Sequence, residues 1–253
     1  MILPALARAK QKTQGIYCMN NTKEITLAWN MYASDNNDHL VWNSDGGNDG
    51  KQKGNEAWVA GWLDFTTSPD NTNITYLVDH TVNLYGAYLG PYIKNPAAFK
   101  CPADQSQVRI AGQSLSRVRS VSMNNYVGTP AQVRPTGLWT GTSRYTQCKT
   151  YAQIKSPVDM FVLLDERSDS INDGWYASDP DTMWQVVDFP ASYHGNAAGY
   201  SFADGHSEIH RFHDPRTMPV LKQGQLMTLN VSLPGDQDVL WMAQHAAGVA
   251  AYP

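Results

Sequence analysis

Histidine and carboxylate side chains recur near the C-terminal end of the chain at a spacing that could bind a metal. The set comprises His194, Asp204, His206, Glu208 and His210, and Gly205 follows Asp204. Alternate residues of a strand share one face, and a zinc enzyme needs about three convergent ligands. However, the order is not that of the helical His-Glu-x-x-His motif, and no separate general base stands out. We therefore expect a structural role, in which His194 forms a hydrogen bond near a turn and Asp204 serves the turn itself.

A second group of carboxylates lies in a short acidic segment. Its members are Asp165, Glu166, Asp169 and Asp173. Carboxylate oxygens in a flexible loop are the hard ligands that calcium accepts, so calcium is a candidate cofactor. The spacing is not that of an EF-hand loop. The alternative is that these residues are solvated turn acids with Arg167 as a local partner.

The third group is aromatic, with eight tryptophans in the chain. Trp139, Trp175 and Trp184 lie in or beside segments rich in turn-forming residues, at 125–150 and 168–190. Exposed tryptophans commonly stack on sugars or on protein partners. These three residues are therefore a candidate binding face, and the alternative is that they belong to the core.

Three cysteines, Cys18, Cys101 and Cys148, lack the paired spacing of a zinc site. Two of them could form a disulfide if the protein is exported, and the alternative is three reduced, buried thiols. The sequence shows no glycine-rich phosphate loop, nucleophile elbow or Cys-His catalytic pair.

The elements that position these residues follow from local patterns. Residues 3–33 have apolar side chains at roughly helical spacing, and the polar segment 34–38 ends that helix. Strands are predicted at 118–123, 160–164, 199–203 and 207–212, as an antiparallel set, with Asp204-Gly205 in the turn of a hairpin. Asp79 or Thr81 should cap a short helix through Leu89, and Asp236 or Asp238 a final helix through His245.

Composition narrows the function classes. The chain has 253 residues, 42% of them hydrophobic, which is enough to bury a sizeable core. A net charge of -4 argues against a nucleic-acid partner, because phosphate binding usually depends on a concentrated basic patch. No window approaches the length and hydrophobicity of a membrane span.

Several segments together resemble one family. They are Leu3–Lys10, Cys18–Asn21, Ala28–Ala33, Cys101–Asp104, Arg119–Asn124, Leu164–Glu166, the His194 to Gly205 stretch, and Asp238–His245. The chain is similar in these segments to the prepilin-type, processing-associated His-x9-Asp-Gly proteins, a pseudopilin or type II secretion protein G-like family of planctomycete and verrucomicrobial bacteria. Ala103 departs from the serine that is usual in the family's Cys-Pro-Ser-Asp.

The resemblance implies an α+β, pilin-like fold, with a long N-terminal helix packed on an antiparallel sheet that carries large loop insertions. Residues 1–37 would form the helix and residues 38–253 the head. Cys18 and Cys101, which both lie in matching segments, would form the disulfide and leave Cys148 free.

The implied function is that of a non-catalytic structural subunit of a type II secretion or type IV pilus-related assembly. Its partners would be other pilin or pseudopilin subunits and the secretion machinery. The protein would be anchored in the inner membrane of the cell envelope, with a periplasmic or extracellular head. We expect that the membrane-spanning part of the helix has been removed ahead of Met1. An exported carbohydrate-binding or ligand-binding module, with calcium and a polysaccharide partner, is the alternative.

Overall fold

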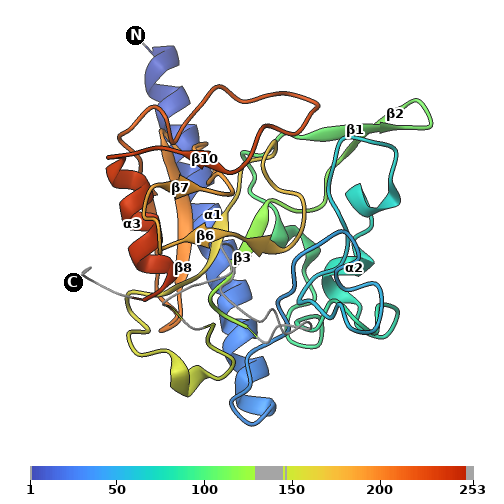
Figure 1. Ribbon diagram of the computed structural model, residues 1–253. Coiled ribbons are helices and arrows are strands. Elements are labelled where there is room, and N and C mark those ends of the chain that lie inside the picture. Colours follow the sequence, from blue (N-terminus) through green and yellow to red (C-terminus); the bar gives the residue numbers. More distant parts are fainter. Residues whose placement is uncertain (1, 129–144, 146, 249–253) are drawn as a thin grey trace.

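A computed structural model describes residues 2–128, 145 and 147–248, and the chain begins in a single long helix. This helix, α1, spans Ile2–Asp35, as the spacing of apolar residues predicts. It ends where Asn37 and Asp38 adopt left-handed backbone conformations, which asparagine and aspartate tolerate better than most residues. The first turns of α1 extend beyond the rest of the molecule, and its second half lies behind the central sheet (Figure 1).

The central sheet has five strands in the order β5-β3-β4-β8-β9. The strands are β3 (Val121–Asn124), β4 (Phe161–Asp165), β5 (Trp175–Tyr176), β8 (Ala197–Phe202) and β9 (Ser207–Arg211). The pairs β3–β4, β4–β8 and β8–β9 are antiparallel, as predicted, but β5 pairs with β3 in parallel. The four predicted strands therefore form an antiparallel set as expected, and the unpredicted strand β5 makes the sheet as a whole mixed. Residues 166–174 connect β4 to β5 as a long segment instead of a hairpin turn. This length allows β5 to lie beside β3 and pair with it in parallel.

The two faces of the sheet are covered by different helices. Alternation along β8 directs Gly199 and Ser201 toward α1, where the Ser201 hydroxyl lies 2.6 Å from the Thr26 hydroxyl. Tyr200 points to the other face, where its ring centroid lies 5.0 Å from that of Trp241 in α3. Helix α3 spans Gln237–Ala246, and Asp236 is its N-cap, in agreement with the sequence prediction.

The remaining elements are short. The bounds are η1 Pro69–Asn71, α2 Thr75–Val78, η2 Pro96–Phe99, β1 Gln107–Ile110, β2 Gln113–Ser116, η3 Tyr151–Gln153, β6 Ser178–Asp179, β7 Gln185–Val186 and β10 Val231–Ser232. Strands β1 and β2 form a hairpin, and β10, β7 and β6 form a small second sheet. The helix predicted through Leu89 is wrong, because Asp79 accepts a hydrogen bond from the Thr81 amide in a local turn and Ala87 adopts a positive φ of 53°.

The fold is thus α+β, with one continuous core between α1, the central sheet and α3. Within the described residues, none of the helices has the length and apolar character needed to cross a bilayer.

Candidate functional site

Four side chains from distant parts of the sequence meet on the α1 face of the sheet. They are Cys18 in α1, Cys101 just after η2, Asp165 at the end of β4, and His194 ahead of β8. One sulfur, nitrogen or oxygen atom of each residue lies within 4.8 Å of the corresponding atom of every other. We call these four residues the interface cluster.

Local structure fixes each member of the interface cluster. The Cys101 amide donates a hydrogen bond of 2.7 Å to the Ser120 hydroxyl beside β3. The Asp165 carbonyl accepts one of 2.8 Å from the Ala191 amide. The backbone around His194 is held by a hydrogen bond of 3.2 Å from its amide to the Ala197 carbonyl. These contacts, together with the helical backbone of α1 at Cys18, fix the positions of the four residues.

Two glycines leave the space that the interface cluster occupies. A Cβ atom at position 199 would lie 3.2 Å from the Cys18 sulfur and 3.8 Å from an Asp165 carboxylate oxygen. A Cβ atom at position 15 would lie 3.4 Å from the His194 ring. Glycine at both positions therefore lets α1 approach β8 closely enough for the four side chains to meet.

The contacts within the interface cluster converge on one ring nitrogen. The Nε2 atom of His194 lies 3.3 Å from Cys101 Sγ and 3.3 Å from Asp165 Oδ2, and the Cys18 thiol also forms a hydrogen bond with Asp165 Oδ2. Within the described residues, His194 Nδ1 and Asp165 Oδ1 have no hydrogen-bond partner. Cys101 and Asp165 thus both contact His194 Nε2, and the Cys18 thiol lies beside the same Asp165 oxygen. The second polar atom of each of His194 and Asp165 makes no hydrogen bond with the described residues.

The electrostatics of the interface cluster follow from burial and mutual contact. Burial raises the pKa of the Cys18 thiol well above its usual value. The hydrogen bond from Cys18, followed by that from His194, lowers the pKa of Cys101. Burial alone would lower the pKa of His194, but its hydrogen bonds with Asp165 and Cys101 raise it to about 10. These contacts make Cys101 easier to ionise than Cys18, and they favour protonation of His194.

This geometry does not match a nucleophilic catalytic triad. In such a triad the carboxylate orients one ring nitrogen while the nucleophile contacts the other. Here both Cys101 and Asp165 contact Nε2 of His194. The side chains of His194 and Asp165 are also almost completely buried, with exposures of 1% and 0%, so a substrate has no open approach to these groups.

The residues of the predicted hairpin motif have separate roles. Asp204 accepts hydrogen bonds from the His206 amide and ring, and Gly205 adopts a φ of 92°, so both serve the turn as predicted. The prediction for His194 is wrong, because its side chain joins the interface cluster instead of bonding near the turn. His210 lies on the predicted face of β9, where it stacks on Trp241 with ring centroids 3.5 Å apart. The predicted metal ligands of β9 thus do not converge with His194.

The carboxylates that suggested calcium are buried and bound to different protein groups. Asp165 belongs to the interface cluster, and Glu166 accepts hydrogen bonds of 2.6 Å from the Ser122 and Ser170 hydroxyls. Asp169 pairs with Arg167, which confirms the local partner but in a buried setting.

Asp173 accepts hydrogen bonds from the Gly46 and Trp175 amides, at 3.0 and 2.8 Å. In the described part of the chain these four carboxylates do not gather around one point. The expectation of a shared calcium site in an exposed loop is therefore not met.

Trp175 and Trp184, two of the tryptophans proposed for a binding face, do not form an exposed face together. Trp175 is buried, with 4% of its surface exposed, and it packs with Ala177 and Val187. Trp184 is only partly exposed, and Trp139 lies outside the described residues. The core alternative applies to Trp175 because β5 joins the central sheet.

All three cysteines are free and buried in the structure. The proposed partners Cys18 and Cys101 do lie together, as members of the interface cluster, but their sulfurs are not bonded. Cys148 is separate from them, as predicted. The sequence analysis missed a Cys-His pair, because Cys101 and His194 are separated by 93 residues.

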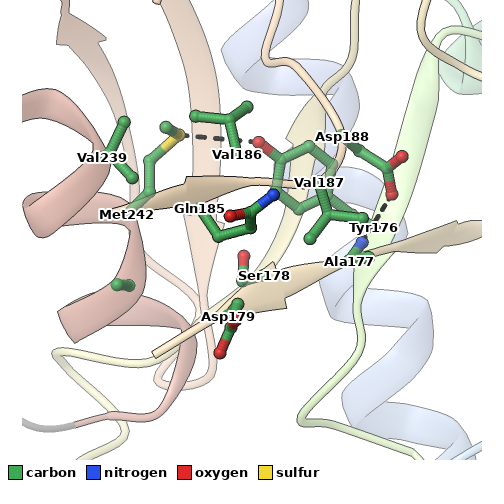
Figure 2. A pocket seen from close by; sticks show the side chains of 11 residues that line it. Tyr176, Ala177, Ser178, Asp179, Gln185, Val186, Val187, Asp188, Val239 and Met242 are labelled. Carbon is green, nitrogen blue, oxygen red and sulfur yellow. Dashed lines mark hydrogen bonds between the residues drawn. The ribbon is translucent and has the colours of Figure 1, made fainter. Parts of the chain in front are cut away.

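A small pocket lies between the second sheet and α3, but its polar groups are already used (Figure 2). The Asp188 carboxylate accepts a hydrogen bond of 2.7 Å from the Ala177 amide. The Tyr176 hydroxyl contacts the Met242 sulfur at 3.5 Å, and Asp179 accepts hydrogen bonds from Thr182 and Asp181. We interpret this pocket as a packing gap.

All four members of the interface cluster lie in segments that marked the family resemblance, and this was the available signal for the site. Comparisons with protein-family models, curated proteins and solved structures find no match to this chain.

Proposed function

We propose that this protein is a pseudopilin-like structural subunit of a type II secretion or type IV pilus-related assembly, and that it acts by packing instead of by catalysis. The observation that carries the proposal is the outer face of α1. Apolar side chains are exposed there at Leu6, Ile16, Tyr17, Leu27 and Met31.

These five positions form one stripe on the helix. At 3.6 residues per turn they fall within about 100° of the helix circumference. The opposite side of α1 carries Cys18, Ile25 and Trp29, which are buried against the head. The exposed stripe therefore points away from the molecule's own core, in the position where a helix of a neighbouring subunit would pack.

The exposed N-terminal turns of α1 support the same proposal. Every side chain from residue 5 to residue 13 is exposed, and this part of the helix projects beyond the sheet (Figure 1). A free helix of this kind contributes little stability to its own head, because helical stability in proteins comes mainly from packing. We infer that these turns pack against other subunits.

Site-specific photo-crosslinking tests the proposal. A photoreactive amino acid would replace Leu27 in the full-length protein expressed in its own bacterium. Leu84 in the head provides a matched control, because the two leucines are 60% and 63% exposed. We expect position 27 to form adducts with pilin-like subunits and position 84 to form none.

A substitution at the same position provides a functional measurement. Leu27→Arg should reduce incorporation of the subunit into envelope assemblies, because it places a charge in a helix-packing interface. Leu84→Arg should leave incorporation unchanged. Identical adducts from both positions, or normal incorporation of Leu27→Arg, would contradict the proposal.

A further inference from the structure

The interface cluster joins two sulfur, one nitrogen and one oxygen donor at the contact between α1 and the sheet. Each member comes from a different segment of the chain, and the four donor atoms lie within 4.8 Å of one another. In the part of the chain that the structure describes, no other group of three or more His, Cys, Asp or Glu side chains brings its donor atoms this close together. We propose that the interface cluster binds one Zn²⁺ ion as a structural site that ties α1 to the sheet.

The donor set suits zinc. Zinc accepts cysteine sulfur, histidine nitrogen and aspartate oxygen, and it binds four of them as a tetrahedron in structural sites. Thiolate ligands also favour zinc over the hard cations magnesium and calcium. Asp165 therefore contributes to a mixed, sulfur-rich site instead of an all-oxygen calcium site.

The two separations that involve His194 agree with the edges of such a tetrahedron. Ordinary zinc–ligand bond lengths give edges of about 3.3 Å between nitrogen and oxygen and about 3.6 Å between sulfur and nitrogen. The distance between His194 Nε2 and Asp165 Oδ2 is 3.3 Å, and that between His194 Nε2 and Cys101 Sγ is also 3.3 Å. The Cys18 sulfur, however, contacts Asp165 Oδ2 more closely than a tetrahedral edge allows, so Cys18 would have to move away from Asp165 to admit the ion.

The interface cluster is shielded from solvent, although all four of its side chains can carry a charge. Cys18 is 0% exposed and Cys101 is 1% exposed, which is typical of a structural site with no open coordination position. Burying a carboxylate, two thiols and an imidazole is costly unless their charges are compensated. A divalent cation would compensate the carboxylate and both thiolates, leaving a net charge of -1.

The glycines around the cluster are a second, independent observation. Gly199 on β8 and Gly15 on α1 each face a cluster side chain; a Cβ at position 199 would press on the Cys18 sulfur, whereas one at position 15 would make an ordinary contact with the His194 ring. This space is needed if the four ligands must surround an ion. A disulfide between Cys18 and Cys101 would use only the two sulfurs and would leave Asp165 and His194 as a separate buried pair.

Zinc binding exchanges protons of the ligands for the metal ion, and no group is oxidised or reduced. The Cys18 thiol proton and the proton shared by Cys101 and His194 are both released to solvent, so that the two sulfurs bind as thiolates and His194 binds as the neutral imidazole through Nε2. Asp165 binds as the carboxylate. The disulfide is excluded in this state, since both sulfurs are bonded to the metal.

Metal analysis of the protein tests this proposal without changing the sequence. Protein purified under reducing conditions without chelator should contain about one equivalent of zinc. Replacement of zinc by Co²⁺ should give the visible absorption of a tetrahedral site and a near-ultraviolet thiolate-to-cobalt charge-transfer band. These measurements remain valid even if a ligand variant fails to fold.

Variants then assign the ligands. Cys101→Ser should weaken zinc binding at least about 100-fold, because loss of a direct ligand costs no less than loss of an outer-shell contact. Cys148→Ser, a control at the buried cysteine outside the cluster, should retain about one equivalent. Chelator treatment should lower the Tm of the unaltered protein and of Cys148→Ser.

Three results would overturn the proposal. The first is metal-free protein with all three thiols free and no cobalt spectrum after reconstitution. The second is a Cys18–Cys101 disulfide found by mass spectrometry in protein isolated with thiols blocked during lysis. The third is loss of zinc from Cys148→Ser to the same degree as from Cys101→Ser. Each leaves the packing role of α1 untouched, because that role is measured by crosslinking at Leu27.

Discussion

Gly199 on β8 faces Cys18 on α1 so closely that a Cβ at position 199 would lie 3.2 Å from the Cys18 sulfur. No left-handed backbone conformation requires glycine there, since Gly199 is outside the set of positive-φ residues. The requirement is the close approach of helix and strand.

The first prediction concerns this approach. Gly199→Val should lower the free energy of unfolding by about 1 to 3 kcal/mol, because the added methyl groups overpack the interface between α1 and β8. The measurement is urea unfolding followed by circular dichroism.

Gly47→Val is the control for Gly199→Val. Gly47 is exposed, its φ is not left-handed, and a Cβ there would meet its nearest neighbour, the Trp62 ring, at an ordinary 3.8 Å. Equal unfolding midpoints for Gly199→Val and the unaltered protein would show that α1 does not pack this tightly on β8.

The second prediction concerns Asn124, a buried residue that links β4 to the end of α3. Its side-chain amide donates hydrogen bonds of 2.7 Å to the Phe161 carbonyl and 2.8 Å to the Ala246 carbonyl. Asn124→Ala should cost about 2 to 4 kcal/mol of unfolding free energy, because buried backbone groups lose their partners.

Asn20→Ala, at an exposed position of α1, is the matched control for Asn124→Ala and should change stability little. Both variants would be compared by thermal and urea unfolding. A cost below that of the control would mean that the bridge through Asn124 does not form.

The third prediction is a pH dependence that arises from His210. Burial lowers the pKa of His210 to about 4, the Asp238 carboxylate opposes this shift, and His245 and His213 add to it. The folded state therefore resists protonation that the unfolded chain accepts near pH 6.5. Stability from this group is complete above about pH 6.5 and is lost as the pH falls toward 4.

His210→Tyr should keep the stacking on Trp241 and remove this dependence. Between pH 8 and pH 5 the unaltered protein should lose about 1 to 2 kcal/mol more unfolding free energy than the variant, because solvent screening of this partly exposed ring reduces the full effect of the pKa shift. His206→Gln changes an exposed histidine of the same hairpin and should retain the original slope. Parallel pH curves for His210→Tyr and the unaltered protein would refute a neutral, half-buried His210.

The fourth prediction concerns the N-cap of α3. Asp236 accepts hydrogen bonds from the Asp238 and Val239 amides and from the Thr217 hydroxyl. Asp236→Ala should cost about 1 to 2 kcal/mol, because the first amides of α3 lose their acceptor. Asp236→Asn keeps a capping oxygen and should recover most of the loss, as measured by urea unfolding. Equal losses in the two variants would contradict a capping role.

The elements that the sequence predicted well are those whose signals are local. Helix α1 follows from apolar spacing, the β8–β9 hairpin from Asp204-Gly205, and α3 from the capping Asp236. Each signal arises among residues within a few positions of one another, so the surrounding fold has little influence on it. The helix expected through Leu89 failed because the side chain of Asp79 closed a local turn instead of a cap.

The interface cluster required the tertiary structure. Cys18 and Asp165 are separated by 147 residues, and Cys101 and His194 by 93, so no local spacing rule connects them. The burial of the acidic segment and of Trp175 depended in the same way on the path that brings β5 beside β3. From the sequence, polar residues in a turn-rich segment are expected to be exposed to solvent. The reason is that the distant residues that bury them cannot be identified from local spacing.

The sequence by itself determined an α+β chain with a long N-terminal helix, a C-terminal hairpin and a capped final helix. These features depend on backbone preferences and side-chain periodicity, which act over one or two turns or strand repeats. Only the tertiary structure decided which face of α1 is buried and which polar residues meet at the interface cluster. Those outcomes depend on contacts between segments far apart in the chain, whose geometry is set by the packing of the whole core.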